Sequence, residues 1–237
     1  MKLSAPIYVL KRKAKLLARG NEIALHQALN KVAIEEGFNS WSHLASSAKN
    51  KNPGQQILSQ LKSGDLVLIG ARPGQGKTLL GLELAASASQ LHRRGYFFTL
   101  DYHERDVADR LSTIGIDPAS INKSVVIDTT DDISADYVIN RLRAERKSGL
   151  IVIDYLQLLD QKRTNPSLDD QIKSLRKYTI ETDGICVLIS QIDRSFDLGK
   201  KSMPGISDVR LPNPLDLTAF SKFCFLHGGK IQLEQAA

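Results

Sequence analysis

The chain has 237 residues, of which 42% are hydrophobic and 24% are charged, and its formal net charge is +6. This size and composition predict a globular protein with one large domain, or with one domain and a small appendage. No run approaches the roughly 18 apolar residues that crossing a bilayer requires, and no apolar stretch follows the first positive charges. We therefore expect a cytoplasmic protein with no membrane partner.

The excess positive charge belongs to the first 53 residues. Nine Lys and Arg face three Glu in that segment, whereas basic and acidic residues balance in the rest of the chain. Such an uneven distribution predicts an anionic partner for the N-terminal segment.

Three short helices are predicted in this segment, because apolar residues recur there at helical spacing. The first is expected to start near Pro6, the second to end at Gly37, and the third to be capped by Asn39 or Ser40. Trp41 belongs to the apolar pattern of the third helix, which favours a core position over a base-stacking one. Residues 1–48 are therefore predicted to form a basic helical module.

The first of these helices is rich in basic residues. Lys11, Arg12 and Lys15 are candidates for contacts with DNA phosphates. The same pattern is also typical of the solvated face of an amphipathic helix, and the sequence leaves both interpretations open.

A polar stretch that contains Pro53 and Gly54 predicts a linker at residues 49–56. Beyond it, short apolar runs alternate with helical stretches, which predicts an α/β domain at residues 57–237 with a mainly parallel sheet flanked by helices. The expected strands are residues 66–70, 95–100, 125–127, 150–154, 185–191 and 223–227. Cys186 and Cys224 lie in these runs and are expected to be core thiols rather than a disulfide or metal pair.

A glycine-rich loop, called the phosphate loop below, connects the first of these strands to a helix. It reads Ala71-Arg72-Pro73-Gly74-Gln75-Gly76-Lys77-Thr78 and is followed by Leu79, so only the first glycine of the P-loop pattern is replaced. Gly74 and Gly76 let the backbone approach closely, so the loop amides and the helix N-terminus are predicted to enclose the phosphates of ATP. Lys77 would reach the β- and γ-phosphates, and Thr78 would ligate Mg²⁺. The alternative is an ordinary glycine-rich turn, which the flanking strand and helix disfavour.

Magnesium also requires a carboxylate. Asp154 follows four apolar residues and is expected at the carboxyl edge of the sheet, where ligands bind in open α/β sheets. An aspartate after a strand is also common as a turn starter, but the upstream phosphate loop favours the metal-binding interpretation.

Three segments together resemble the ATPase domain of DnaB-type replicative helicases. They are residues 71–78, Val-Ile-Asp-Tyr-Leu-Gln-Leu-Leu at 152–159 and Leu-Ile-Ser-Gln-Ile-Asp-Arg-Ser at 188–195, and Ser-Asp-Val-Arg at 207–210 is similar to a further segment of that family. The resemblance covers about residues 55–226. It implies a RecA-like P-loop NTPase core, assembly as a hexamer, and ATP hydrolysis coupled to movement along single-stranded DNA. The N-terminal module does not resemble the N-terminal domain of that family.

The resemblance also implies roles for residues after the fifth predicted strand. Gln191 falls where the family has a glutamine that senses the γ-phosphate and relays its state to DNA-binding loops. Residues 194–203 would form one such loop, with Arg194, Lys200 and Lys201 as phosphate contacts. A solvated loop with ordinary charges remains the alternative. Arg72 is compatible with a contact to the nucleotide or to a neighbouring subunit.

The sequence departs from the family at the catalytic acid. Where the family has a glutamate, this chain has Asp101, whose side chain is one methylene shorter. Asp101 is predicted to orient the attacking water as general base, with Glu104 as a substitute that could reach back. Because misplacing a catalytic group by about 1 Å costs on the order of a hundredfold, slow turnover is expected.

A second departure is an expected absence. Family members continue past the last strand into a basic hairpin that reaches the ATP of a neighbouring subunit, and this chain is expected to lack that hairpin, because it stops at Ala237, soon after Gly228-Gly229-Lys230. No Lys-x-Arg-Asn-Gly sequence occurs here, and Lys230 is the nearest basic residue without matching that sequence residue by residue. An inserted arginine contributes roughly a thousandfold or more to phosphoryl transfer, so weak unaided hydrolysis is expected.

Two functions therefore fit the sequence. The motif set and the basic module favour a DnaB-like DNA-dependent ATPase, which includes a DNA helicase or a helicase remnant. Asp101, the expected loss of the hairpin and the small size of the chain favour the alternative, a regulatory or interaction protein that uses ATP as a switch and unwinds nothing.

Overall fold

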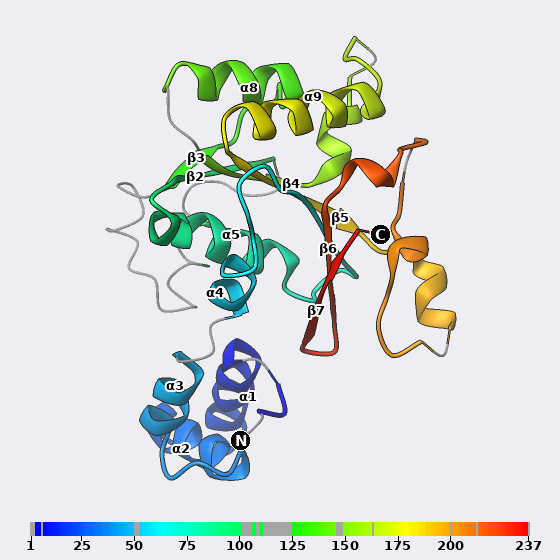
Figure 1. Cartoon of the computed structure of the whole chain (residues 1–237). Coiled ribbons are helices and arrows are strands. Elements are labelled where there is room, and N and C mark those ends of the chain that lie inside the picture. Colours follow the sequence, from blue (N-terminus) through cyan, green and yellow to red (C-terminus); the bar gives the residue numbers. More distant parts are fainter. Residues whose placement is uncertain are drawn as a thin grey trace. The chain divides into compact units, whose positions relative to one another are not determined.

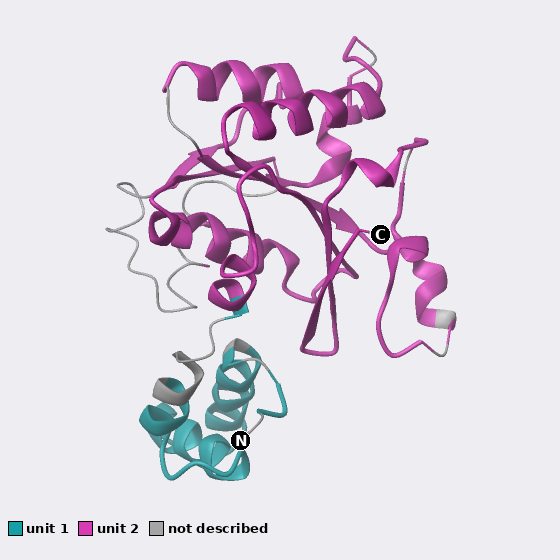
Figure 2. Ribbon diagram, viewed as in Figure 1, with its two compact units in different colours: residues 1–53 teal, residues 54–237 magenta. Residues whose placement is uncertain are grey.

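A computed structural model of the chain divides into two compact units, residues 1–53 and residues 54–237, which Figure 2 colours separately. We call them the N-terminal unit and the sheet unit. The structure describes residues 3–5, 7–49, 53–100, 106, 107, 110, 125–145, 149–162, 164–199, 201–211 and 213–236. Each unit has a hydrophobic core of its own.

Three helices form the N-terminal unit, as the apolar spacing predicts. They are α1 (Ile7–Gly20), α2 (Leu25–Glu35) and α3 (Trp41–Lys49). Their shared core contains Leu10, Ala14, Ala28, Val32, Ala33, Phe38 and Leu44. Trp41 packs against this core, so its predicted role as a packing residue is confirmed.

The helix ends follow the predicted signals. The Ser40 hydroxyl caps α3 by accepting a hydrogen bond from the His43 N–H at 3.2 Å. Gly37 follows Glu36, the C-cap residue of α2, and has a φ of 83°, a left-handed conformation that glycine adopts without steric cost.

The sheet unit is built on a seven-stranded sheet in the order β3-β2-β4-β5-β1-β6-β7 (Figure 1). The strands are β1 (Leu66–Ala71), β2 (Arg94–Thr99), β3 (Val125–Asp128), β4 (Gly149–Asp154), β5 (Ile185–Gln191), β6 (Lys222–His227) and β7 (Lys230–Gln235). Every neighbouring pair is parallel except β6 with β7. The predicted mainly parallel sheet is therefore confirmed.

Helices cover both faces of this sheet (Figure 1). Helices α8 (Ala135–Arg143) and α9 (Leu168–Glu181) lie on one face, and α4 (Pro53–Leu58) and α5 (Lys77–Ser87) lie on the other. Short 3-10 helices are η1 (Ala88–Leu91), η2 (Leu156–Asp160), η3 (Arg194–Leu198), η4 (Ile206–Asp208) and η5 (Leu217–Ala219).

Strand β1 shows why its sequence must be apolar throughout. Successive side chains of a strand point to opposite faces. Leu66 and Leu68 belong to the core that includes α8 and α9, whereas Val67 and Ile69 belong to the core that includes α5. A strand covered on both faces cannot alternate apolar with polar residues.

Helix α4 differs from the prediction, because it starts at Pro53 inside the expected linker of residues 49–56. Proline fits the first turn of a helix, where its missing N–H is no loss. Ile57 and Leu58 are then buried in the core of the sheet unit, so tertiary packing stabilises this short helix.

Strand β7 was not predicted, and it forms an antiparallel hairpin with β6. Gly228 and Gly229 make the turn with φ values of 56° and 75°, as two-residue hairpin turns require. Ile231 and Leu233 pack toward the core, whereas Lys230 and Gln232 are exposed. The criterion of continuous apolar runs misses such a half-exposed edge strand. The expectation that the chain lacks a hairpin after its last predicted strand is therefore wrong, although this hairpin does not contain the Lys-x-Arg-Asn-Gly sequence.

The cysteines are free and buried, which confirms that they are core thiols. Burial raises the pKa of both thiols, that of Cys224 to about 12, so neither is reactive at neutral pH. Among the described residues, no helix has the length and apolar character that crossing a membrane demands.

Candidate nucleotide-binding site

The phosphate loop leaves the end of β1 and runs into the first turn of α5. Gly74 and Gly76 adopt φ values of 79° and 89°, and Gly76 is the residue that precedes α5. A side chain at Gly74 would meet nothing within 4 Å, so the backbone conformation rather than crowding favours glycine there. The loop therefore has the left-handed residues that turn consecutive amides toward one side.

Close packing sets the distance between α5 and the sheet. A Cβ at Gly81 of α5 would lie 2.7 Å from Ile189 of β5 and 3.0 Å from Val152 of β4. Only glycine lets the helix lie this close to the sheet. The first amides of an α-helix have no intrahelical acceptor, so the N-terminus of α5 is a suitable anion site at the end of β1.

Two residues with side-chain oxygen atoms that can ligate a metal lie near the start of α5. Thr78, in the first turn of α5, is 7% exposed, and Asp154, the last residue of β4, is 1% exposed. Strand β5 lies between β1 and β4, and Asp154 is level with Ile189, which in turn is level with Ile69. Adjacent strands are about 4.8 Å apart, so Asp154 lies about 10 Å across the sheet from Ile69 of β1.

This donor set suits magnesium. A hydroxyl and one carboxylate are hard oxygen ligands, and Mg²⁺ usually combines one or two carboxylates with phosphate oxygens and water. Among the described residues, His, Cys, Asp and Glu form no cluster of three or more that would hold a metal by itself. The residues present therefore fit a Mg²⁺ ion that arrives with a nucleotide.

Gln191 ends β5 and is paired in register with Ala71, the last residue of β1. Its carbonyl oxygen accepts a hydrogen bond from the Arg210 N–H at 2.8 Å, and the next residue, Ile192, donates its N–H to the Ala71 carbonyl at 3.1 Å. Gln191 is thus held between the start of the phosphate loop and residues 207–210. It lies on β5, between the two strands that carry the phosphate loop and Asp154.

The Arg72 side chain turns to residues 192–197. Its Nε and Nη2 lie 2.9 and 2.8 Å from Oδ2 of Asp197, and its Nη1 donates to the Ile192 carbonyl at 3.1 Å. The guanidinium therefore already has a carboxylate partner within its own chain. Gln75 makes a second such connection, because its Oε1 accepts the Gly228 N–H of the β6–β7 turn at 2.9 Å.

Sequence reasoning did not identify Asp197 or Gly228 as neighbours of the phosphate loop. Asp197 is 125 residues from Arg72, and Gly228 is 153 residues from Gln75. No local pattern signals a pairing at this separation. Only the strand order, which places β5 and β6 on either side of β1, brings these segments to the loop.

The candidate DNA loop is partly described. Arg194 is exposed at the start of η3, whereas Lys201 forms an ion pair with Asp208 at 3.0 Å. A hydrogen bond from the Gly205 N–H, helped by Lys201, holds the pKa of the Asp208 carboxyl below its usual value. Lys201 is therefore partly neutralised by Asp208. Lys200 lies outside the described residues.

Asp101, the predicted general base, and Glu104 also lie outside the described residues. Strand β2 ends at Thr99, which is level with Asp154 and fully buried. The chain therefore leaves β2 beside the candidate metal ligand, two residues before Asp101.

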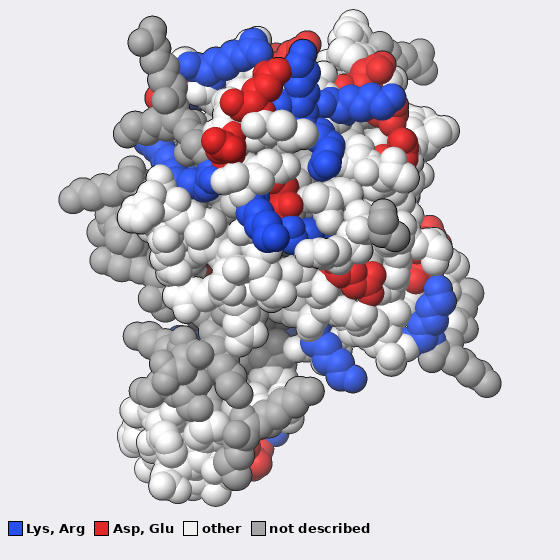
Figure 3. Space-filling model, viewed as in Figure 1, with Lys and Arg blue, Asp and Glu red and all other residues white. Residues whose placement is uncertain are grey.

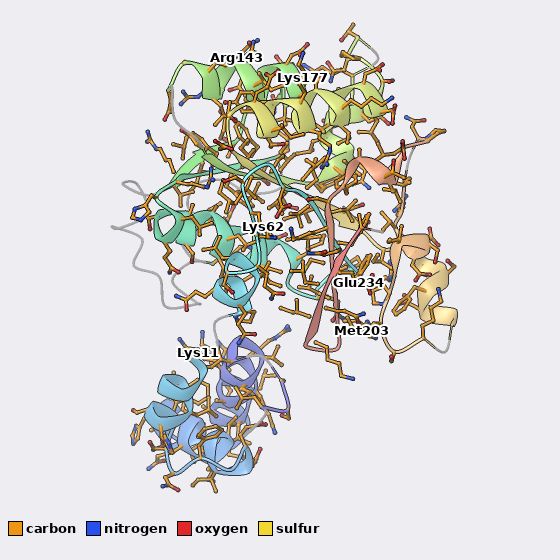
Figure 4. The ribbon with its side chains drawn as sticks, viewed as in Figure 1. Lys11, Lys62, Arg143, Lys177, Met203 and Glu234 are labelled. Atoms are coloured by element: carbon orange, nitrogen blue, oxygen red, sulfur yellow. The ribbon has the colours of Figure 1, made fainter. Side chains whose placement is uncertain are left out.

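The basic residues of α1 differ in their surroundings. Arg12 and Lys15 are exposed and Lys11, labelled in Figure 4, is half-buried. Lys13 instead forms an ion pair with Glu35 of α2 at 2.7 Å, which raises the pKa of the lysine. In contrast, the face of the sheet unit in Figure 3 shows acidic and basic side chains interspersed.

Comparison with protein families gives a match over most of the sheet unit. A family model described as the DnaB-like helicase C terminal domain matches residues 55–122 and 118–219. The replicative DNA helicase DnaB of Geobacillus stearothermophilus is 24% identical in an alignment of length 201, and the match covers 70% of this chain and 44% of that protein. A probable plasmid replicative DNA helicase of Chlamydia trachomatis is 25% identical in an alignment of length 181, and the match covers 63% of this chain and 40% of that protein. The chain thus spans less than half the length of these relatives.

Solved structures show the same fold. A DnaB-like replicative helicase, solved in a study of its interactions with primase, has a TM-score of 0.60 at 20% identity and covers 92% of this chain and 65% of its own. A KaiC-like protein from Pyrococcus horikoshii has a TM-score of 0.51 at 17% identity and covers 68% of this chain and 70% of its own. The predicted RecA-like core is therefore confirmed.

Proposed function

The chain belongs to the DnaB-like helicase C-terminal domain family, and from this premise we propose that it binds ATP with Mg²⁺ and hydrolyses it at the carboxyl edge of the sheet. One observation carries the proposal. A glycine-rich loop leads from β1 into the N-terminus of α5, and the buried Asp154 ends β4 two strands away.

Each residue of the site has a role that follows from its position. The amides of residues 73–79 and the N-terminus of α5 bind the phosphate oxygens, and Lys77 neutralises charge at the β- and γ-phosphates. Thr78 and Asp154 hold the magnesium ion, which supplies charge neutralisation when bound. Gln191 lies between them on β5 and senses the γ-phosphate.

Hydrolysis transfers the γ-phosphoryl group to water. Asp101 orients the water and takes one of its protons while the bond between the γ-phosphorus and the bridging oxygen breaks, and ADP and phosphate leave. The shorter side chain of Asp101, compared with a glutamate, predicts slow turnover in the absence of a partner.

The first experiment measures ATP hydrolysis by the purified chain with and without single-stranded DNA. We expect hydrolysis that is stimulated by DNA and lost in Lys77→Ala. Lys177→Ala is the matched control, because Lys177 lies on α9 away from the phosphate loop (Figure 4). If Lys77→Ala hydrolyses ATP as fast as the wild type, the proposed nucleotide site is wrong.

Single-stranded DNA is the proposed partner of residues 194–203. Arg194 is exposed and available to a phosphate, whereas Lys201 must release Asp208 to make such a contact. Arg194→Ala is therefore expected to reduce DNA stimulation more than Lys201→Ala does. Equal effects of the two substitutions would contradict this ranking.

The N-terminal unit is proposed to contribute a second, purely electrostatic DNA contact through Lys11, Arg12 and Lys15. Each phosphate neutralised on a single strand contributes about −0.7 to the slope of log affinity against log salt. Replacing all three residues with alanine should make that slope about 2 units shallower. Lys13→Ala is the control, because Lys13 is already paired with Glu35. A slope unchanged by the triple substitution would leave these residues as a solvated helix face.

A nucleotide switch is the second candidate function, and the exchange of glutamate for Asp101 favours it. Such a protein would bind ATP tightly, and DNA would not change its turnover.

Hexamer formation is proposed on the family relationship alone. Sedimentation of the chain with and without Mg²⁺ and ATP tests it, and a monomer under both conditions would contradict it.

A further inference from the structure

The phosphate loop has side chains that bind neighbouring segments rather than solvent. Arg72 reaches Asp197 of η3 through Nε and Nη2 and reaches the Ile192 carbonyl through Nη1. The Ile192 N–H donates to the Ala71 carbonyl at 3.1 Å. Ile192 directly follows Gln191. Its N–H and its carbonyl are therefore bound by Ala71 and Arg72, two consecutive residues at the start of the loop.

Gln75 makes the corresponding connection on the other side of β1. Its Oε1 accepts a hydrogen bond from the Gly228 N–H at 2.9 Å, at the turn between β6 and β7. Gly228 has a φ of 56°, so its N–H direction is fixed by a tight turn. The tip of the hairpin is thus anchored to the middle of the phosphate loop.

The two anchored segments also contact each other. The rings of Phe196 in η3 and His227 in β6 lie 5.0 Å apart with an interplanar angle of 82°, and Phe196 is only 5% exposed. Edge-to-face contacts of this kind are attractive and directional. The phosphate loop, η3 and the hairpin turn are consequently connected pairwise by contacts that form a ring.

Arg72 and Gln75, which make the polar contacts of this ring, belong to the loop that is proposed to bind the triphosphate. A triphosphate bound by the loop amides would fix the backbone that carries Arg72 and Gln75. The Arg72 side chain is only 18% exposed, and its guanidinium binds Asp197 and the Ile192 carbonyl, so within this chain it acts on the segment after Gln191.

We infer that Arg72 and Gln75 are positioning residues, through which nucleotide binding at the phosphate loop sets the position of residues 192–197 and of the β6–β7 turn. The inference rests on the proposed function, because it requires that the loop binds nucleotide. It assigns each side chain one target: Arg72 positions η3, which starts with the candidate DNA contact Arg194, and Gln75 positions the hairpin turn that precedes Lys230.

Amide hydrogen exchange in the full chain tests whether Arg72 and Gln75 act on these two separate segments. In the wild type, Mg²⁺ with a non-hydrolysable ATP analogue is expected to slow exchange in residues 192–199 and in residues 227–230. In Arg72→Ala the protection of 192–199 should be lost while that of 227–230 remains, and Gln75→Ala should show the reverse. Because these readouts need binding and not turnover, slow hydrolysis does not affect them.

Turnover supplies a second readout that a purely structural role would not move. Asp197→Asn keeps the shape of the side chain and removes its charge. The stimulation of ATP turnover by single-stranded DNA should fall about twofold to fivefold, the range that a partly exposed ion pair supports, with little change in KM for ATP. Exchanging the partners in Arg72→Asp with Asp197→Arg should restore part of it. Glu181→Gln, in the exposed Lys177–Glu181 pair on α9, is the matched control.

The outcomes distinguish a failure of the proposed function from a failure of the inference about Arg72 and Gln75. A wild-type chain that binds no nucleotide contradicts the proposed function, and the inference with it. A chain that binds nucleotide, yet shows equal protection of both segments in the wild type, Arg72→Ala and Gln75→Ala, contradicts only the inference. A fall in KM and turnover together, with DNA stimulation unchanged, would also overturn it.

Discussion

The ammonium group of Lys222 lies 2.5 Å from Oδ2 of Asp65, and both side chains are buried where β1 and β6 begin. Asp65 also accepts hydrogen bonds from the Lys62 N–H and the Ser221 hydroxyl. This buried pair therefore connects the turn before β1 with the segment that enters β6. It lies at the amino edge of the sheet, opposite the phosphate loop.

Breaking this pair from one side should destabilise the protein strongly. Lys222→Met leaves the carboxylate of Asp65 buried without its cation, and the expected loss in free energy of unfolding is about 3–5 kcal/mol. Urea denaturation measures it. Asp65→Asn combined with Lys222→Met should recover a large part of the loss, because no charge remains buried. A double variant that is as unstable as Lys222→Met would contradict this explanation.

Glu83 on α5 should make stability depend on pH. Burial raises the pKa of this carboxyl to about 7, although a hydrogen bond from the Gly54 N–H opposes the shift. The folded state therefore holds the proton more tightly than the unfolded state, whose pKa is near 4.5. The contribution of Glu83 to stability is therefore full below about pH 4.5 and is lost as pH rises toward 7, which lowers the free energy of unfolding by about 3 kcal/mol.

Glu83→Gln tests this directly, since the amide cannot ionise. Thermal unfolding between pH 5 and about 8 should lose most of its downward slope in the variant. The uncharged side chain should also make the protein more stable than the wild type at pH 8. A slope that is unchanged by the substitution would show that other groups cause it.

Gly95 on β2 should not tolerate a side chain. A Cβ there would lie 2.0 Å from the carbonyl oxygen of Ala85, which is backbone of α5 and cannot rotate away. Gly95→Ala is expected to cost about 3 kcal/mol or more, because α5 must move away from the sheet. Gly205→Ala is the control, since its Cβ would meet only Asp208 Oδ2 at 4.0 Å. Chemical denaturation of the two variants should differ clearly.

Thr78 should matter for the metal rather than for packing. Thr78→Ala is expected to weaken Mg²⁺-dependent ATP binding by at least about tenfold, which corresponds to about 1.4 kcal/mol. Thr78→Ser keeps the hydroxyl and should stay near the wild type. Titration of a fluorescent ATP analogue with and without EDTA measures both. If Thr78→Ala binds as well as Thr78→Ser in the presence of Mg²⁺, the hydroxyl is not a metal ligand.

The sequence predicted most elements because their signals are local. Apolar runs bounded by turns indicated β1 to β6, and Ser40 and Gly37 marked helix ends. Strand β7 was not predicted, because an edge strand needs only every second residue to be apolar. Helix α4 was not predicted, because Pro53 and Gly54 also indicate a linker, and the burial of Ile57 and Leu58 outweighs that local signal.

The features of the candidate site also fall into those with a local sequence signal and those that depend on tertiary structure. By itself the sequence determined the phosphate loop, the carboxylate at the end of an apolar strand and the family, because each is written in consecutive residues. Only the tertiary structure decided that β5 separates Asp154 from the phosphate loop, that Lys201 is paired with Asp208, and that Arg72 and Gln75 hold segments more than 100 residues away. These relationships depend on strand order and on three-dimensional distance, and no spacing along a chain encodes either.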